Sequence, residues 1–225
     1  MRSRGLVVAI DGPSGAGKST AGKALAARLG YVFLDTGAMY RAIALKALES
    51  GVNLEDGPAL GALARASTIG FIRDEAVLLD GRDVTSAIRT REVATAASRA
   101  SGHPELRKEM VARQRELGKE GGIVLDGRDI GTAVFPDAEI KFFVDADPHR
   151  RAIRRQLELG GSESDLPGIE RELRERDRAD SARKDSPLVR AEDARYLDTT
   201  SLSPEETLAA MLSAVEAVAS GERRG

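Results

Sequence analysis

A glycine-rich segment near the N-terminus constrains this chain more than any other feature of its sequence. The apolar residues 6–10 precede the segment and predict a buried strand, while the residues from Gly17 onward predict a helix that ends at Gly30. A strand, a glycine-rich turn and a helix start together aim backbone N–H groups at a polyphosphate. The alternative is a glycine-rich turn that binds nothing. The segment follows the pattern G-x-x-x-x-G-K-[ST] of a phosphate-binding loop and comprises Gly12, Pro13, Ser14, Gly15, Ala16, Gly17, Lys18, Ser19 and Thr20.

Two side chains of this loop have predicted chemical roles, and a third residue far along the chain joins them. Lys18 is expected to reach the β- and γ-phosphates of a nucleotide, and the Ser19 hydroxyl is expected to ligate Mg²⁺. An apolar strand is predicted at residues 123–125, and Asp126 follows it directly. In proteins with such a loop, a carboxylate at the end of a neighbouring strand holds Mg²⁺. The sequence therefore predicts a Mg²⁺–nucleotide site built from Lys18, Ser19 and Asp126.

The order of apolar runs indicates the fold class. Helical stretches separate these runs, and the alternation favours an α/β fold, a five-stranded parallel sheet with helices on both faces. The last helix is predicted to begin with Ser203 as its N-cap, Pro204 as its first residue and Glu206 as the partner in a capping box. We expect this phosphate-loop core to comprise residues 1–35, 122–147 and 184–225. The predicted strands are residues 6–10, 31–34, 123–125, 140–144 and 195–197.

Two long connections interrupt the core. Residues 36–121 are too many for a simple crossover, and strand-like pieces around an Asp80-Gly81 turn predict a small antiparallel sheet in an insert at about residues 60–100. Residues 148–183 are predicted to form two charged helices joined by a loop. Ligands bind at the carboxyl ends of parallel strands, so we expect a substrate-holding subdomain and a helical lid. Within the first connection, helices are predicted at residues 39–50, 57–66, 89–101 and 104–119.

Composition excludes several classes of function. The 225 residues carry a net charge of -2, so no overall field favours nucleic acid or an anionic membrane surface. Aromatic residues make up 4% and tryptophan is absent, which argues against a stacking platform for single-stranded nucleic acid. Cysteine is absent, which rules out disulfides and thiolate metal sites. With no signal-peptide core or membrane span in view, we expect a cytoplasmic protein that acts as a monomer.

Polar residues follow two of the predicted strands. Thr36 is expected to cap a helix that begins after it, and Arg41 then lies about one turn inside that helix. Arg128 and Asp129 come just past the strand that ends at Asp126, and they offer donors and a carboxylate to one ligand. The alternatives are a capped helix with a solvated arginine and a strand-end turn with a surface ion pair.

The segment 171–183 is dense in charge. Arg176, Asp180 and Arg183 have the spacing i, i+4 and i+7, so a helix would place them on one face. Arginines that close over a transferring phosphoryl group stabilise its developing charge, whereas a solvated helix face is the alternative. A second cluster on the preceding helix comprises Arg150, Arg151, Arg154 and Arg155.

Taken together, these motifs resemble the bacterial cytidylate kinase family of phosphate-loop nucleoside monophosphate kinases. They cover nearly the whole chain in the family's order. The resemblance implies transfer of the γ-phosphoryl group of ATP to CMP or dCMP, with Mg²⁺, an NMP-binding subdomain and an arginine-rich lid. The motifs are G-P-S-G-A-G-K-S-T, L-D-T-G-A-M-Y-R, I-R-T-R-E-V-A-T-A-A-S, D-G-R-D-I-G-T-A-V-F-P-D-A and E-R-D-R-A-D-S-A-R.

The resemblance also implies roles for individual residues. It implies that Asp180 holds the sugar hydroxyl, and that Arg176 faces the transferred phosphoryl group together with Lys18, Arg128 and Arg183. It further implies that Ser98, Arg107 and Asp129 read the cytosine edge, and that Thr36, Arg41, Arg128 and Arg183 surround the CMP phosphate.

Three other functions are weighed against this one. Another small-molecule phosphate-loop kinase would share the loop and the lid but would not need Ser98, Arg107 and Asp129 together. A GTPase switch needs an N-K-x-D guanine reader, and Asn53 is the one asparagine in the chain. A nucleic-acid-dependent ATPase is disfavoured by the balanced charge and the few aromatic residues.

Overall fold

The computed structural model describes residues 2–72 and 76–220. The chain divides into two compact units. One unit contains the described residues up to Phe33 and from Glu120 onward, and the other is Leu34–Lys119. Within the described residues, no helix combines the length and the apolar character that crossing a membrane requires.

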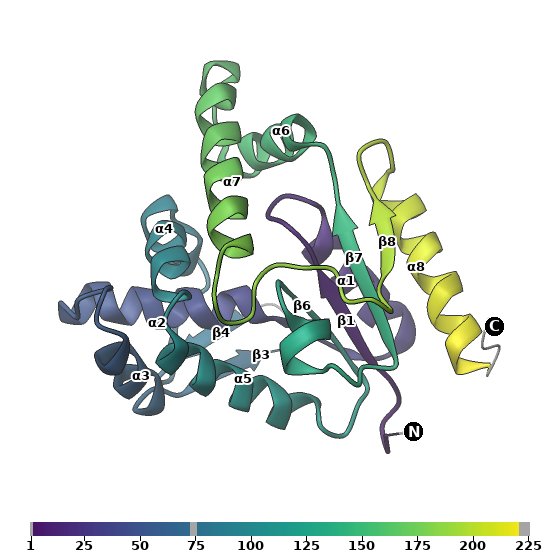
Figure 1. The fold of residues 1–225 in the computed structure, drawn as a ribbon, viewed down its shortest axis with the longest axis horizontal. Coiled ribbons are helices and arrows are strands. Elements are labelled where there is room, and N and C mark those ends of the chain that lie inside the picture. Colours follow the sequence, from purple (N-terminus) through teal and green to yellow (C-terminus); the bar gives the residue numbers. More distant parts are fainter. Residues whose placement is uncertain (1, 73–75, 221–225) are drawn as a thin grey trace. The chain divides into compact units, whose positions relative to one another are not determined.

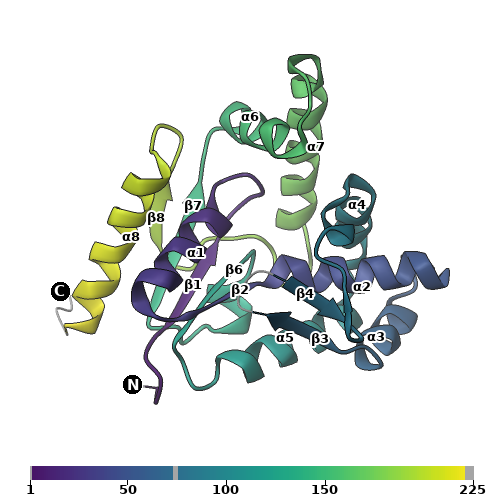
Figure 2. The ribbon, with the colours of Figure 1, turned by 180° about the vertical axis from the view of Figure 1, so that it is seen from behind.

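A five-stranded sheet has the strand order β2-β6-β1-β7-β8 (Figures 1 and 2). Strand β1 pairs in parallel with β6 on one side and with β7 on the other, and β7 pairs in parallel with β8. The predicted parallel sheet is thereby confirmed, and each strand extends one or two residues beyond its predicted end. The strands are β1 (Val7–Asp11), β2 (Val32–Asp35), β6 (Ile123–Gly127), β7 (Ile140–Asp145) and β8 (Arg195–Asp198).

Helices α1 (Lys18–Leu29) and α8 (Pro204–Ala219) pack against each other and against this sheet (Figure 2). Helix α1 ends at Gly30, which has a φ of 67°, as the sequence predicts. The capping box of α8 is also confirmed, because the Ser203 hydroxyl accepts from the Glu206 N–H and the Glu206 carboxylate accepts from the Ser203 N–H. Leu25, Phe142, Met211 and Val215 are among the buried residues that join the two helices to the strands.

The second unit contains four α-helices and a small antiparallel sheet among its described residues. Asp80 and Gly81 have φ values of 52° and 83°, the pair of positive angles that a tight hairpin turn requires. Strand β4 pairs antiparallel with both β3 and β5, which confirms the predicted antiparallel sheet. Arg73, predicted in its first strand, lies outside the described residues. The elements are α2 (Thr36–Ser50), α3 (Gly57–Arg65), β3 (Ile69–Ile72), β4 (Ala76–Leu79), β5 (Arg82–Asp83), α4 (Arg91–Ala100) and α5 (Pro104–Gly118).

Two helix starts in this unit differ from the prediction. Helix α2 begins three residues earlier than predicted, because the Asp35 carboxylate accepts from the Ala38 N–H at 2.9 Å and caps it. Thr36 is the first helical residue and not the cap. Helix α4 begins after Thr90, whose hydroxyl accepts from the Val93 N–H, and a short 3₁₀ turn, η1 (Ala87–Arg89), precedes it.

The charged connection in the first unit is a helical hairpin of α6 (Pro148–Leu159) and α7 (Leu166–Ser181), joined through the 3₁₀ turn η3 (Glu163–Asp165). The hairpin has a small apolar core of Ala152, Ile169 and Leu173, against which Leu166 packs. A further irregular element, the π-helix η2 (Ile130–Val134), follows β6. Both elements adjoin the carboxyl ends of the central strands, where the candidate site lies.

Candidate active site

The glycine-rich loop lies between β1 and α1, at the carboxyl end of the central strand of the sheet. Gly12 has a φ of 145°, and a Cβ at this position would lie 1.9 Å from the carbonyl oxygen of Val144. Gly17, with a φ of 90°, is the N-cap of α1, and within the described residues no side chain caps this helix. An anion can therefore take the place of the cap at the start of α1.

Lys18 is the first residue of α1, and its ammonium is buried. The Lys18 Nζ donates a hydrogen bond to the Pro13 carbonyl oxygen at 2.6 Å. Burial, with the positive charges of Arg128 and Arg176, lowers the pKa of Lys18 from 10.5 to about 7, although the Asp126 carboxylate acts in the opposite direction. A bound polyanion would offset the repulsion among these cations. The electrostatics of the site therefore favour a phosphate beside Lys18.

Ser19 and Asp126 meet at the end of β6. The Ser19 hydroxyl donates a hydrogen bond to Asp126 Oδ2, and the Asp126 carboxylate is buried. The two residues lie 107 positions apart in the chain, and they meet because β1 and β6 are neighbouring parallel strands. A hydroxyl and a carboxylate are oxygen donors of the kind that Mg²⁺ prefers. Among the described residues, no group of three or more His, Cys, Asp or Glu could hold a metal ion.

Asp11 is a functional candidate that the sequence analysis missed. Its buried carboxylate accepts hydrogen bonds from the N–H groups of Ile130 and Gly131, each at 2.7 Å. Burial raises the pKa of Asp11 from 3.8 to about 6, the charge of Asp129 adds to this effect, and the two backbone hydrogen bonds and Lys18 oppose it. Asp11 thereby fixes the chain directly after Arg128 and Asp129. The available signal was a carboxylate that ends an apolar strand immediately before the loop.

Arg128, Asp180 and Arg183 form one cluster in the first unit. The Arg128 Nε donates to Asp180 Oδ2 at 2.9 Å, and the Arg183 Nη2 donates to Asp180 Oδ1. Burial by itself would raise the pKa of Asp180, but the charges of Arg128, Arg183 and Arg176 hold it below 3.8. The carboxylate therefore stays ionised and orients two of the predicted phosphate-binding arginines. Arg183 lies beyond the end of α7, so it does not share a helix face with Arg176 and Asp180 as predicted.

Asp129 adjoins this cluster as the residue before η2. Its side chain is buried, and its carbonyl oxygen accepts hydrogen bonds from the N–H groups of Ala133 and Val134. This backbone pattern belongs to the π-helical turn, an element that occurs frequently at functional sites. The structure thus places the predicted base reader in an ordered turn held by Asp11.

In the second unit, Thr36 and Arg41 lie in the first turns of α2. The Arg41 Nη2 donates to Asp35 Oδ2 at 2.7 Å, while the other Asp35 oxygen caps the helix. Thr36 is buried. Asp35 therefore fixes both the start of α2 and the direction of the Arg41 guanidinium. Sequence reasoning had assigned the first of these roles, the helix cap, to Thr36.

Ser98 and Arg107 lie on either side of the turn between α4 and α5. The Arg107 Nη1 donates to the Ser101 carbonyl oxygen at 3.4 Å, and the Ser101 hydroxyl donates to the Ser98 carbonyl oxygen at 3.0 Å. The Arg107 guanidinium lies over the Tyr40 ring, 5.7 Å from its centroid, and the arginine is 5% exposed. Helices α2, α4 and α5 together hold this arginine. The predicted site residues are thus divided between the two units: Thr36, Arg41, Ser98 and Arg107 belong to the second and the others to the first.

A family model and the similar curated proteins agree on one family for this chain. The family model "Cytidylate kinase" matches residues 8–217. A cytidylate kinase of Solibacter usitatus (strain Ellin6076) is 48% identical over 218 residues, which cover 95% of this chain and 94% of that protein. A cytidylate kinase of Geobacillus sp. (strain WCH70) is 50% identical over 206 residues, which cover 89% and 92%. The crystal structure of an uncharacterized protein from Eubacterium ventriosum ATCC 27560 has a TM-score of 0.50 at 12% identity, covers 94% of this chain and 98% of that one, and supports the fold alone.

Proposed function

Because the chain belongs to the cytidylate kinase family, we propose that it transfers the γ-phosphoryl group of ATP to CMP or dCMP. The products are ADP and CDP or dCDP. The observation that carries this proposal is the family match over residues 8–217, which includes the loop with its buried Lys18 as well as both connections between the core strands.

The loop and α1 bind the polyphosphate of ATP in this proposal. Backbone N–H groups of the residues from Gly12 to Thr20, except Pro13, which has none, surround the phosphates. Lys18 contacts the β- and γ-phosphates. The Ser19 hydroxyl and the Asp126 carboxylate fit Mg²⁺ in their chemistry and in their mutual contact. When bound, Mg²⁺ neutralises charge on the β- and γ-phosphates.

Thr36, Arg41, Arg128 and Arg183 bind the CMP phosphate. Asp180 supports this role, because it orients Arg128 and Arg183 and keeps their charges paired until the substrate arrives. Each carboxylate oxygen has two acceptor positions, so Asp180 can also accept a hydrogen bond from the sugar hydroxyl.

Ser98, Arg107 and Asp129 read the cytosine base. The Asp129 carboxylate accepts from the exocyclic amine, and Ser98 and Arg107 donate to the ring nitrogen and the carbonyl oxygen. UMP has a carbonyl oxygen in place of the amine, so it would place an acceptor against the acceptor of Asp129. A site that pairs polar groups with its substrate rejects analogues that leave those groups unpaired. We therefore expect a strong preference for CMP over UMP.

The transfer itself needs no general base, because the attacking phosphate oxygen of CMP is already ionised at neutral pH. Catalysis then depends on positioning and on stabilising the charge of the transferring group. Lys18, Arg128, Arg176 and Arg183 supply the positive charge. The 148–183 region acts as the lid that brings Arg176 to the reacting phosphoryl group.

The protein is proposed to act in the cytoplasm, where ATP and nucleoside monophosphates are available, with nucleotides and not nucleic acids or membranes as its partners. A single chain supplies every predicted site residue, so a monomer is sufficient. Size-exclusion chromatography with light scattering tests the monomer, which a dimer at assay concentration would contradict.

A coupled assay of ADP release with a panel of nucleoside monophosphates tests the proposed activity. We expect turnover with CMP and dCMP, about 10²-fold or more lower kcat/KM with UMP, and none with alcohols that are not nucleotides. Equal turnover of CMP and UMP would contradict the assignment of Asp129. ATP hydrolysis that depends on added RNA or DNA, without CMP phosphorylation, would contradict the proposed function as a whole.

A further inference from the structure

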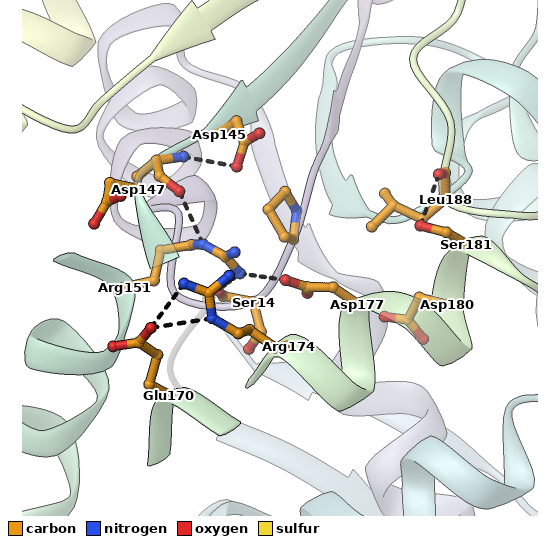
Figure 3. Close-up of polar contacts among 12 residues, drawn as sticks. Ser14, Asp145, Asp147, Arg151, Glu170, Arg174, Asp177, Asp180, Ser181 and Leu188 are labelled. Atoms are coloured by element: carbon orange, nitrogen blue, oxygen red, sulfur yellow. Dashed lines mark hydrogen bonds and ion pairs between the residues drawn. The ribbon is translucent and has the colours of Figure 1, made fainter. Parts of the chain in front are cut away.

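Arg151 is a buried arginine that has no part in the proposed mechanism so far. It lies in the first turn of α6, and its side chain is 5% exposed. The Arg151 Nε donates to the carbonyl oxygen of Ala146 at 2.9 Å, and Nη1 donates both to the carbonyl oxygen of Ser14 at 3.3 Å and to Asp177 Oδ2 at 2.6 Å (Figure 3). One guanidinium therefore joins the end of β7, the phosphate-binding loop and helix α7.

The start of α6 packs closely against the phosphate-binding loop. A Cβ at Gly15 would lie 3.0 Å from the carbonyl oxygen of Arg151 and 3.1 Å from its Cβ. At such distances a shift of the loop has to move the first turn of α6 with it, because close-packed backbone does not compress. The hydrogen bond from Arg151 to Ser14 adds a polar link to this contact. A displacement of the loop on nucleotide binding therefore also displaces Arg151.

Asp177 continues the connection into α7. It follows Arg176, whose charge acts on both Lys18 and Asp180. Three residues later, Asp180 pairs with Arg128 at the end of β6. Helix α7 is therefore held at two points, by Asp177 to the loop side of the site and by Asp180 to the β6 side. The rotation of the helix, and with it the position of Arg176, depends on both.

A second ion pair on the same helix provides a contrast. Arg174 and Glu170 pair at 2.8 Å with the spacing i, i+4, and their side chains are 50% and 25% exposed. Glu170 also lies 3.1 Å from Nδ1 of His149 on α6, whose side chain is 60% exposed, so Glu170 joins the same two helices as Asp177 but at the surface and without reaching the loop. Pairs in contact with water contribute little, whereas a pair excluded from water is held strongly because losing one partner leaves an uncompensated charge. The Arg151–Asp177 pair, with side chains 5% and 21% exposed, is the one suited to transmit a displacement.

We propose that Arg151 and Asp177 are a positioning pair that couples nucleotide binding at the loop to the placement of Arg176 on α7; the inference rests on the proposed phosphoryl transfer. Neither residue touches the reacting atoms. The pair acts on the reaction through the angle of α7, so its loss lowers kcat while the binding of CMP, which uses other residues, is nearly unchanged.

Steady-state kinetics with three single variants and one double variant test the pair. Asp177→Asn keeps the shape of the side chain and removes its charge, and Arg151→Lys keeps the charge but cannot make the three contacts. We expect kcat to fall about 10²-fold in each, as for displacement of a catalytic group by about 1 Å, with KM for CMP changed less than about threefold. The double variant combines Asp177→Asn with Arg151→Lys. Its kcat is expected to be no lower than that of the less active single variant, because the effects of two residues that act as a unit do not add. Glu170→Gln, the control, stays within about twofold of the unmodified protein.

Thermal unfolding of each variant separates positioning from stability. If Asp177→Asn and Arg151→Lys lower Tm but retain kcat at a temperature well below Tm, the pair is merely structural and the inference is wrong. A double variant whose loss in kcat is the product of the two single losses also overturns it.

Hydrogen exchange gives a readout that does not require CMP phosphorylation. We expect Mg²⁺ and a non-hydrolysable ATP analogue to slow amide exchange in α7 of the unmodified protein and of Glu170→Gln, but not of Asp177→Asn. Equal slowing in Asp177→Asn contradicts the coupling. A protein that shows the coupling but does not phosphorylate CMP contradicts the proposed function and leaves the positioning pair in place.

Discussion

Asp11 leads to a prediction about the pH dependence of stability. The carboxylate is 4% exposed, accepts from two backbone N–H groups, and has its pKa raised from 3.8 to about 6. Asp129 and Lys18 are the charged groups that act on it, in opposite directions, and burial has the largest effect. Substituting Asp11 with asparagine keeps the shape of the side chain and removes its titration.

The sign of the effect follows from proton binding. The unfolded chain loses the Asp11 proton near pH 3.8, whereas the folded protein retains it until about pH 6. Between these values the folded state binds more protons, so stability decreases as the pH rises. The rise in the pKa of Asp11 from 3.8 to about 6 corresponds to about 3 kcal/mol, because each tenfold change in proton affinity is worth about 1.4 kcal/mol. This contribution is fully present below the unfolded pKa and is lost once the pH exceeds the folded pKa.

Urea unfolding of the unmodified protein and of Asp11→Asn, followed by circular dichroism at a series of pH values, measures the effect. The contributions of all other titrating groups to the pH dependence are the same in both proteins, so they cancel in the difference between the two unfolding free energies. We expect the unfolding free energy of the unmodified protein, relative to the variant, to decrease by about 3 kcal/mol between about pH 3 and pH 7. A difference that is constant within about 0.5 kcal/mol over this range would refute the reasoning.

Asp198→Asn is the matched control for this experiment. Asp198 lies at the surface, and hydrogen bonds from Thr200 lower its pKa. A carboxylate with a lowered pKa contributes stability above its unfolded pKa and loses it as the pH falls. The difference between the unmodified protein and Asp198→Asn should therefore change in the opposite direction from that of Asp11→Asn.

Three further predictions concern the site. Lys18→Ala should lower kcat for CMP phosphorylation about 10³-fold in the coupled assay, because the substitution removes the charge beside the transferring group; activity within tenfold would contradict its role. Arg107→Ala should lower kcat/KM for CMP about 10²-fold and reduce the preference for CMP over UMP. An unchanged ratio of the two kcat/KM values would contradict a role of Arg107 in base recognition. Gly12→Ala should lose at least about 2 kcal/mol of stability and its affinity for ATP, because its Cβ would lie 1.9 Å from a carbonyl oxygen. Gly30→Ala is the comparison, because a Cβ at Gly30 meets nothing within 4 Å. This variant should lose about 1 kcal/mol of stability, owing only to the positive φ, and should retain activity. Chemical denaturation and nucleotide titration compare Gly12→Ala with Gly30→Ala.

Much of the fold could be predicted because its signals are local. A buried parallel strand needs a run of apolar residues, a tight hairpin needs two residues that tolerate positive φ, and a helix start needs a side chain that accepts from the N–H groups of its first turn. These conditions are met within a few residues at β1, at Asp80-Gly81 and at Ser203. The prediction was wrong where two neighbouring residues competed for one local role, as Asp35 and Thr36 do at the start of α2.

In the candidate site, too, some features follow from the local sequence and others only from the tertiary structure. The sequence alone determined the glycine loop, because the loop pattern directly follows an apolar run and precedes a helix. Only the tertiary structure decided that Asp11 reaches N–H groups 119 and 120 residues away, and that Arg151 bonds to the loop and to α7. A buried charge must find its partners wherever the packing of the chain brings them. Sequence spacing contains no information on such contacts, and the folded sheet and the helical hairpin supply it.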